Sequence, residues 1–179
     1  MKTQRTRRQH GVTLIEASIV VTIGAILAAS ALPSWQETMA ARRLNNVASG
    51  LADDLRLARS SAVARNQALR VSFYARNDGS CYVIHTGAAN QCDCAAAGPA
   101  ACSGGAQALK TVVVSHADHV VLASNVASMR FDPLHGTVTP TGTVRLMGAN
   151  GRELHDVVNI VGRVRTCSAA PAVPGFVAC

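Results

Sequence analysis

The chain has 179 residues, of which 49% are hydrophobic and only 3% are aromatic. Its 17 basic and 10 acidic residues give a formal net charge of +7, but four of the basic residues lie among the first eight. Length and composition predict one modest domain. The scarcity of aromatic side chains argues against a platform on which nucleic-acid bases stack. The sequence contains no nucleophile-elbow, zinc-protease or phosphate-loop motif, so we expect no enzyme and no cofactor.

The chain begins with a basic leader and a long apolar segment. The leader has four basic side chains and ends in a glycine: Lys2, Arg5, Arg7, Arg8 and Gly11. Residues 12–32 hold one charge, Glu16, and 21 residues are enough to span a bilayer as a helix. The basic leader holds the amino terminus in the cytoplasm. Because a carboxylate in hydrocarbon costs about 2.5–3.5 kcal/mol, Glu16 needs a partner.

Two other interpretations of this segment stay open. A secretory signal peptide has a shorter apolar region and a small-residue cleavage site, which residues 28–31 imitate. An ordinary anchor helix is the second alternative, although it has no need for Glu16.

The helix is expected to continue beyond the apolar segment, with a kink at Pro33. Trp35 suits the membrane interface, where indole rings settle. From there to about Ala64 apolar residues recur every three or four positions, which predicts an amphipathic half. Its apolar face comprises Leu44, Val47, Leu51, Leu55, Ala58 and Ala62. We expect the opposite, solvent-facing side to carry the charged residues Arg42, Arg43, Asp53, Asp54, Arg56, Arg59 and Arg65.

After Asn66 the pattern changes to short β-branched segments separated by turns. The predicted strands are residues 69–75, 81–86, 108–115, 119–123, 128–131, 142–147 and 153–165. Residues 77–79 and 148–151 have the composition of hairpin turns, and residues 90–105 read as a Cys-rich loop. The fold class predicted is α+β, a long helix packed on an antiparallel sheet.

The six cysteines suggest disulfide bonds in an exported domain. They are Cys81, Cys92, Cys94, Cys102, Cys167 and Cys179. Six cysteines allow 15 connectivities; we expect Cys167 to pair with Cys179 and the other four to fasten the loop between two strands. A zinc site formed by Cys92, Cys94 and Cys102 with His85 is the alternative, although the C-x-C spacing is tighter than in usual zinc knuckles.

The G-V-T-L-I-E sequence at residues 11–16 resembles the class III signal of type IV pilins and pseudopilins. The resemblance implies cleavage by prepilin peptidase after Gly11 and methylation of the new amino terminus at Val12. It also implies that Glu16 pairs with the amino terminus of a neighbouring subunit when pilins assemble through their helices. The expected location is the bacterial inner membrane, with the head in the periplasm, followed by the pilus or the cell surface.

Residues 57–66, LARSSAVARN, resemble the helix end of the FimT/GspH group of minor pilins and pseudopilins. This resemblance implies a leader at 1–11, a membrane or filament-core helix at 12–35, an amphipathic half at 36–66 and a β-rich head at 67–179. The Cys-rich segment at about 90–105 is its least typical part.

The candidate site is the G-R-V-R sequence formed by Gly162, Arg163, Val164 and Arg165. In an extended strand the two arginines share a face, roughly 6.6 Å apart, and arginine binds phosphate oxygens in pairs. Arg152 and Arg145 would widen the patch. In FimT-type pilins a G-R-x-R motif near the carboxyl end carries DNA binding, which implies natural transformation as the function.

The alternative is that the arginines only keep a strand soluble and block edge pairing. The chain would then be a structural minor pilin, or a GspH-like pseudopilin of type II secretion, that primes filament assembly without DNA.

Overall fold

The structure is a computed structural model that describes residues 13–94 and 98–179, with only the backbone of residues 30–34. The chain divides into two compact units, Met1–Thr38 and Met39–Cys179. One helix, α1 (Leu14–Ala64), contributes to both units. Gly11 and Val12, the residues of the expected processing site, lie outside the described residues.

The first unit contains the amino-terminal half of α1. Thr13 Oγ1 accepts a hydrogen bond from the Glu16 amide at 3.3 Å, and Glu16 lies in the first turn, where a carboxylate interacts favourably with the helix dipole. No helix among the described residues has both the length and the hydropathy needed to cross a bilayer. The helix continues through Pro33. The membrane span and the kink at Pro33 stay predictions.

The second half of α1 presents a buried apolar stripe. Its members are at most 2% exposed and recur every three or four residues: Leu44, Ala48, Leu51, Leu55, Ala58 and Ala62. The helix ends where Asn66 adopts a left-handed conformation, φ 48°. The Gln67 amide then donates to the Ala62 carbonyl at 3.1 Å, which satisfies a carbonyl at the helix end. The predicted end of the helix is confirmed.

Two larger antiparallel sheets belong to the second unit. A five-stranded sheet has the order β5-β2-β1-β7-β8, with bounds Ala108–Ser115, Gly79–Thr86, Leu69–Arg76, Ser128–Phe131 and Val138–Thr139. A four-stranded sheet has the order β11-β10-β9-β6, with bounds Val164–Ser168, Glu153–Val158, Gly142–Gly148 and Val120–Ser124. A short 3₁₀ helix, η1 (His116–Asp118), joins β5 to β6.

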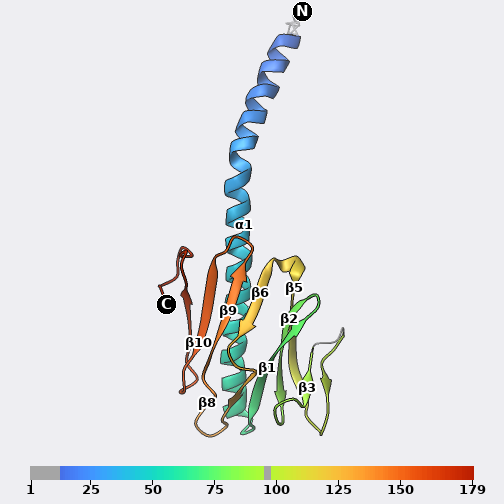
Figure 1. The fold of residues 1–179 in the computed structure, drawn as a ribbon, viewed down its shortest axis with the longest axis vertical. Coiled ribbons are helices and arrows are strands. Elements are labelled where there is room, and N and C mark those ends of the chain that lie inside the picture. Colours follow the sequence, from blue (N-terminus) through green and yellow to red (C-terminus); the bar gives the residue numbers. More distant parts are fainter. Residues whose placement is uncertain (1–12, 95–97) are drawn as a thin grey trace, which may run out of the picture. The chain divides into compact units, whose positions relative to one another are not determined.

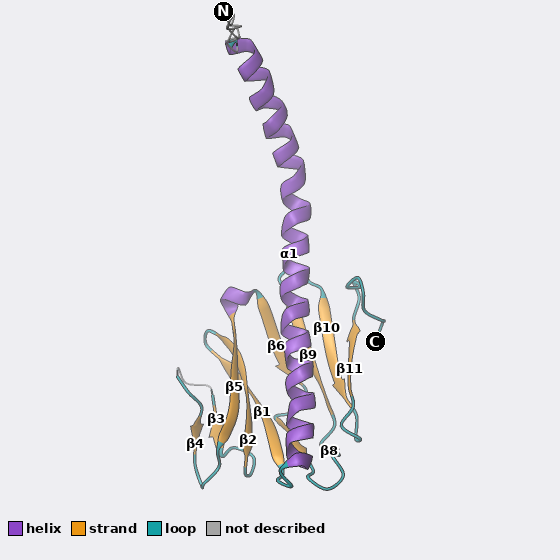
Figure 2. Cartoon of the chain, turned by 180° about the vertical axis from the view of Figure 1, so that it is seen from behind, coloured by secondary structure: helices purple, strands orange, loops and turns teal. Residues whose placement is uncertain are grey.

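Both sheets bury one face against the second half of α1, which lies behind the strands in Figure 1 and in front of them in Figure 2. Side chains alternate along each strand: in β9, Val144 and Leu146 are fully buried, whereas Arg145 between them is exposed. We call the side of the sheets away from α1 the outer face. The predicted α+β class, with a long helix on antiparallel strands, is confirmed.

The prediction of one strand over residues 153–165 is wrong. The segment forms β10 and β11 with a turn between them, because the Gly162 amide donates to the Asn159 carbonyl at 2.9 Å and Gly162 has φ +72°. Glycine reaches that conformation without steric cost. The expected loop at residues 90–105 also contains a two-stranded ladder, β3 (Cys92–Asp93) with β4 (Ala101–Cys102).

The disulfides include the expected pair, Cys167 with Cys179. The other two bonds join Cys81 to Cys94 and Cys92 to Cys102. Cys81 lies in β2, so the Cys-rich segment is fastened to the outer face of the five-stranded sheet. There Cys81, Val83, Cys92 and Cys94 form a small second core. The cysteines of the alternative zinc set are therefore all disulfide-bonded.

The prediction that Asp54 lies on the solvent face of α1 is wrong. Asp54 is 5% exposed because it follows Leu51 by three residues and so falls on the buried stripe. Its carboxylate accepts a hydrogen bond from the Tyr82 hydroxyl at 2.7 Å and forms an ion pair with Lys110 at 2.5 Å. These bonds connect the helix to β2 and β5.

A second carboxylate is buried beneath the helix. Asp156 of β10 is fully buried and accepts a hydrogen bond from the Thr166 hydroxyl of β11 at 2.6 Å. Its other oxygen has no hydrogen-bond partner among the described residues. Burial raises the pKa of the Asp156 carboxyl to about 6, although the bond from Thr166 acts in the opposite direction.

This raised pKa predicts a specific dependence of stability on pH. The fold favours the protonated carboxyl, so its contribution is complete below the unfolded pKa near 4 and is lost as the pH rises through about 6. Asp156→Asn stays neutral throughout. Between pH 4 and pH 7.5, the free energy of unfolding of the wild type should fall relative to this variant by on the order of 2 kcal/mol. Urea denaturation followed by circular dichroism tests this, and parallel curves for the two proteins would contradict it.

Candidate nucleic-acid interface

The candidate arginines lie beside the turn that connects β10 to β11. Asn159 organises this turn: its amide donates to the Arg163 carbonyl at 3.2 Å, and its side-chain oxygen accepts from the Arg163 amide at 2.9 Å. An asparagine that bonds its neighbouring backbone in this way is a common turn-former. The turn thus fixes the backbone on which Arg163 is carried.

Arg59 of α1 packs against the same turn from the helix side. Its Nε donates to the Gly136 carbonyl at 2.9 Å, in the loop between β7 and β8. A Cβ added to Gly162 would lie 2.5 Å from the Gly136 carbonyl oxygen and 2.7 Å from Arg59 Cδ. Only glycine therefore fits, because the turn, the loop and the Arg59 side chain meet at this point. The glycine of the G-R-V-R sequence has a packing role here.

Arg163 and Arg165 are both exposed, on either side of Val164, which is 8% exposed and belongs to the core. This alternation is the one expected of extended backbone. Within the described residues, neither guanidinium makes a side-chain hydrogen bond or an ion pair. Both positive charges are therefore available to a ligand.

The two further candidates differ in their placement. Arg145 is exposed on the outer face of β9, two strands from β11, and the register Arg165↔Val157↔Thr143 places it two residues along from Arg165. Strand spacing and rise give a separation of roughly 12 Å. Arg152 is half-buried in the turn before β10, at the opposite end of that strand from Arg163, roughly 20 Å away. The structure brings Arg145, but not Arg152, near the motif.

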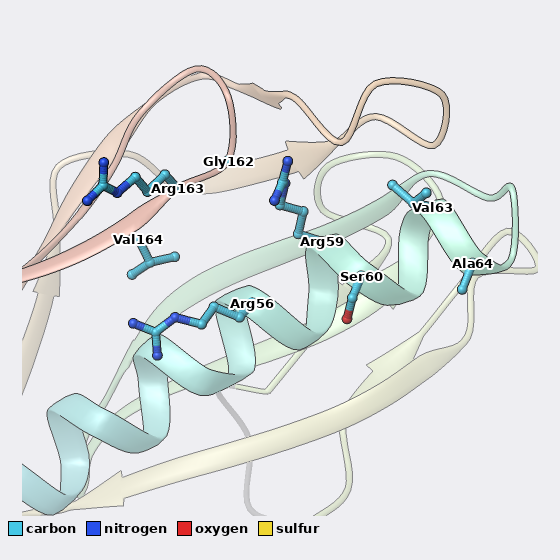
Figure 3. A pocket seen from close by; sticks show the side chains of 8 residues that line it. All are labelled: Arg56, Arg59, Ser60, Val63, Ala64, Gly162, Arg163 and Val164. Atoms are coloured by element: carbon cyan, nitrogen blue, oxygen red, sulfur yellow. The ribbon is translucent and has the colours of Figure 1, made fainter.

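A pocket of about 690 Å³ opens between the end of α1 and the start of β11 (Figure 3). It is lined by Arg56, Arg59, Ser60, Val63, Ala64, Gly162, Arg163 and Val164. Two of its three arginines are already engaged: Arg56 pairs with Asp53 at 2.7 Å, and Arg59 holds Gly136. Arg163 contributes the remaining positive charge at the rim.

Sequence reasoning placed Arg59 among the solvent-facing helix charges and missed its role as a support. The sequence contains only a weak indication of this contact. Gly136 and Gly162 are residues at which another part of the backbone can approach closely, but no neighbouring sequence feature indicates that this part is α1.

Two family models match the chain. The model described as the prokaryotic N-terminal methylation motif matches residues 6–32, and that of the type II transport protein GspH matches residues 47–162. The second match covers more than half of the chain. The chain belongs to the GspH family. It is a minor pilin or pseudopilin of the GspH group, and its methylation motif is that of a pilin processed at the membrane.

The GspH match ends at Gly162, so Arg163 and Arg165 lie immediately beyond it. Among solved structures, the type IV minor pilin FimU of Pseudomonas aeruginosa PAO1 is 21% identical, with 74% of this chain and 93% of that chain covered and a TM-score of 0.48. A comparison with curated proteins gave no match.

The packing around Gly162 predicts a large effect of a single methyl group. Gly162→Ala should lower the free energy of unfolding by about 3 kcal/mol, from the positive φ and the overlap with Arg59 and Gly136 together. Gly151→Ala is the matched control, since Gly151 has φ +73° but nothing within 4 Å of an added Cβ, and should cost about 1 kcal/mol. Equal losses in urea denaturation would show that the contact at Gly162 contributes nothing.

Proposed function

We propose that this GspH-family minor pilin or pseudopilin binds DNA through the phosphate backbone, with Arg163 and Arg165 as the main contacts. The observation that carries the proposal is the pair of exposed, unpaired guanidinium groups that flank buried Val164. Arginine suits this task because its planar fork bonds two phosphate oxygens at once.

Arg145 extends the contact across the outer face of the four-stranded sheet. Its separation of roughly 12 Å from Arg165 is comparable with the width of the major groove, about 12 Å. The arginines can therefore meet phosphates on the two sides of one groove. Arg152 lies too far along β10 to share that groove and has no part in this proposal.

The binding is independent of base sequence. In the described part of the head no aromatic side chain is exposed: Phe73, Tyr74 and Phe176 are half-buried, and Tyr82 and Phe131 are buried. The described part of the head therefore has no exposed aromatic ring on which a base could stack. Affinity comes from phosphate contacts that release counterions. The role served is capture of extracellular DNA for natural transformation, with no enzymatic step and no cofactor.

The amino-terminal segment supplies the route to the cell surface. Residues 12–35 anchor the prepilin in the inner membrane, with its amino terminus in the cytoplasm and its head in the periplasm. Prepilin peptidase cuts after Gly11, and the new amino group of Val12 is methylated. Glu16 then pairs with the amino terminus of a neighbouring subunit, which removes the cost of an isolated carboxylate in hydrocarbon.

A second candidate function is an assembly-priming pseudopilin of type II secretion that binds no DNA. The end of the GspH match at Gly162 favours it, because both candidate arginines lie outside the region that is similar to the family. In this alternative the glycine packing serves the fold alone.

DNA affinity of the full chain in detergent micelles, measured over a salt series, tests the proposal. The wild type should bind duplex DNA with a log–log salt slope of about −0.9 per phosphate contacted. Arg163→Gln with Arg165→Gln should weaken binding at least tenfold and reduce the slope by about 1.8.

Arg42→Gln with Arg43→Gln is the matched control, because both arginines are exposed on α1 within the second unit and the change in charge is the same. This control should retain wild-type affinity. Absence of binding at low salt, or equal losses in the two double variants, would leave the assembly-priming role as the better explanation.

Mass spectrometry of the protein recovered from membranes tests the processing step. We expect a mature chain that begins at Val12 with a methylated amino group. Replacement of Gly11 by a bulky residue should leave the eleven-residue leader in place, since the peptidase site is lost. A mature protein cut instead near residue 31 would support the secretory signal peptide.

A further inference from the structure

Two arginines lie directly opposite each other on the outer face of the five-stranded sheet. Arg70 of β1 is in register with Arg130 of β7. Their neighbours Val71 and Met129 are buried in the core against α1, so the alternation of side chains directs both arginines away from the helix. Side chains paired in this way have Cβ atoms about 5 Å apart.

Like charges in direct opposition destabilise a sheet unless something compensates them. Within the described residues, no carboxylate forms an ion pair with Arg70 or Arg130. The Nε of Arg70 is buried without a hydrogen-bond partner among those residues. Burial, and then the charge of Arg130, lowers the pKa of the Arg70 guanidinium. The sheet thus holds two adjacent positive charges with no internal counterion.

Two residues with hydroxyl groups lie beside the pair, Ser128 and Thr139. Arg70 Nη1 donates to the Ser128 hydroxyl at 2.8 Å, which leaves the proton of that hydroxyl free to donate. Thr139 of β8 is exposed and in register with Arg130. On the other side of Arg70, burial lowers the pKa of His85, with Arg70 acting in the same direction, so the imidazole stays neutral and adds no third charge.

We propose that Arg70 and Arg130, with Ser128 and Thr139, form a binding site for a phosphate group. Guanidinium forks bond phosphate oxygens in pairs, and an oxyanion between the two arginines offsets the repulsion between their charges. The phosphate group belongs either to a phosphodiester backbone or to free inorganic phosphate. The site does not depend on Arg163 or Arg165.

The site adjoins the proposed DNA-binding segment. β8 is hydrogen-bonded to β7, which carries Arg130, and on its other side the Val138 amide donates to the Ile160 carbonyl of the β10–β11 turn at 2.9 Å. One short strand therefore separates Arg130 from the turn that carries Arg163. A nucleic-acid backbone held by both groups would cross from one sheet to the other.

Thermal unfolding of the full chain in detergent micelles tests the site, with inorganic phosphate as the probe and chloride at matched ionic strength as the reference. In tens of millimolar phosphate the midpoint of the wild type should rise by about 3 °C more than that of Arg130→Gln. Arg130 is exposed and makes no side-chain bond among the described residues, so this variant should fold. Arg42→Gln removes one exposed charge elsewhere and should respond as the wild type does.

Phosphate also stabilises proteins in general by exclusion from their surface, and that effect is common to all three proteins. Equal rises in the wild type, Arg130→Gln and Arg42→Gln would therefore overturn the proposal.

Duplex DNA then distinguishes the two sources of the phosphate group. If the site takes a phosphodiester, Arg130→Gln should weaken DNA binding several-fold and reduce the salt slope by about 0.9. Unchanged DNA affinity together with a lost phosphate response would assign the site to the free anion. The double variant at Arg163 and Arg165 should keep the phosphate response, so failure of the DNA proposal and failure of this one can be told apart.

Discussion

The head depends on the burial of one apolar stripe of α1. In the described part of the chain the five-stranded and four-stranded sheets share no strand ladder, and the residues of both belong to one core with that stripe. Each fully buried leucine contributes about 1.5–3 kcal/mol, and Leu44, Leu51 and Leu55 are at most 1% exposed. The burial of these three side chains is therefore comparable in size with the whole net stability of a small domain, about 5–15 kcal/mol. The helix therefore sets the positions of both sheets.

The two faces of the head differ in the charged groups that they carry. Two carboxylates lie on the helix side of the sheets, and each has a hydroxyl partner: Asp54 with Tyr82, and Asp156 with Thr166. The outer face carries Glu153, which pairs with His155, and several exposed arginines, among them Arg130, Arg145 and Arg165. Because an isolated buried charge is costly, each inner carboxylate accepts a hydrogen bond, whereas these three outer arginines make no ion pair among the described residues. The formal charge of the whole chain does not express this asymmetry.

Features with a local signature were predictable from the sequence. The helix period led to the buried stripe and the helix end, and the turn residues placed most strands within two residues of their observed bounds. The turn at Asn159–Gly162 was missed because residues 153–165 contain enough β-branched side chains to read as one strand. Asp54 was predicted to be exposed because carboxylates usually face solvent. Its spacing of three residues from Leu51 places it on the buried side of α1 instead. The opposition of Arg70 and Arg130 was not predictable, because it arises from the register between strands about 60 residues apart.

In the G-R-V-R segment, the glycine and the two arginines have different explanations. The glycine is required by Arg59 and Gly136, two groups from distant parts of the chain, so its presence is explained without any ligand. The arginines are not explained in that way, since neither has a partner among the described residues. Functional weight therefore rests on Arg163 and Arg165 rather than on the four-residue pattern. The strongest support for an anionic partner is that uncompensated arginines recur on the outer face of both sheets, where the fold does not need them.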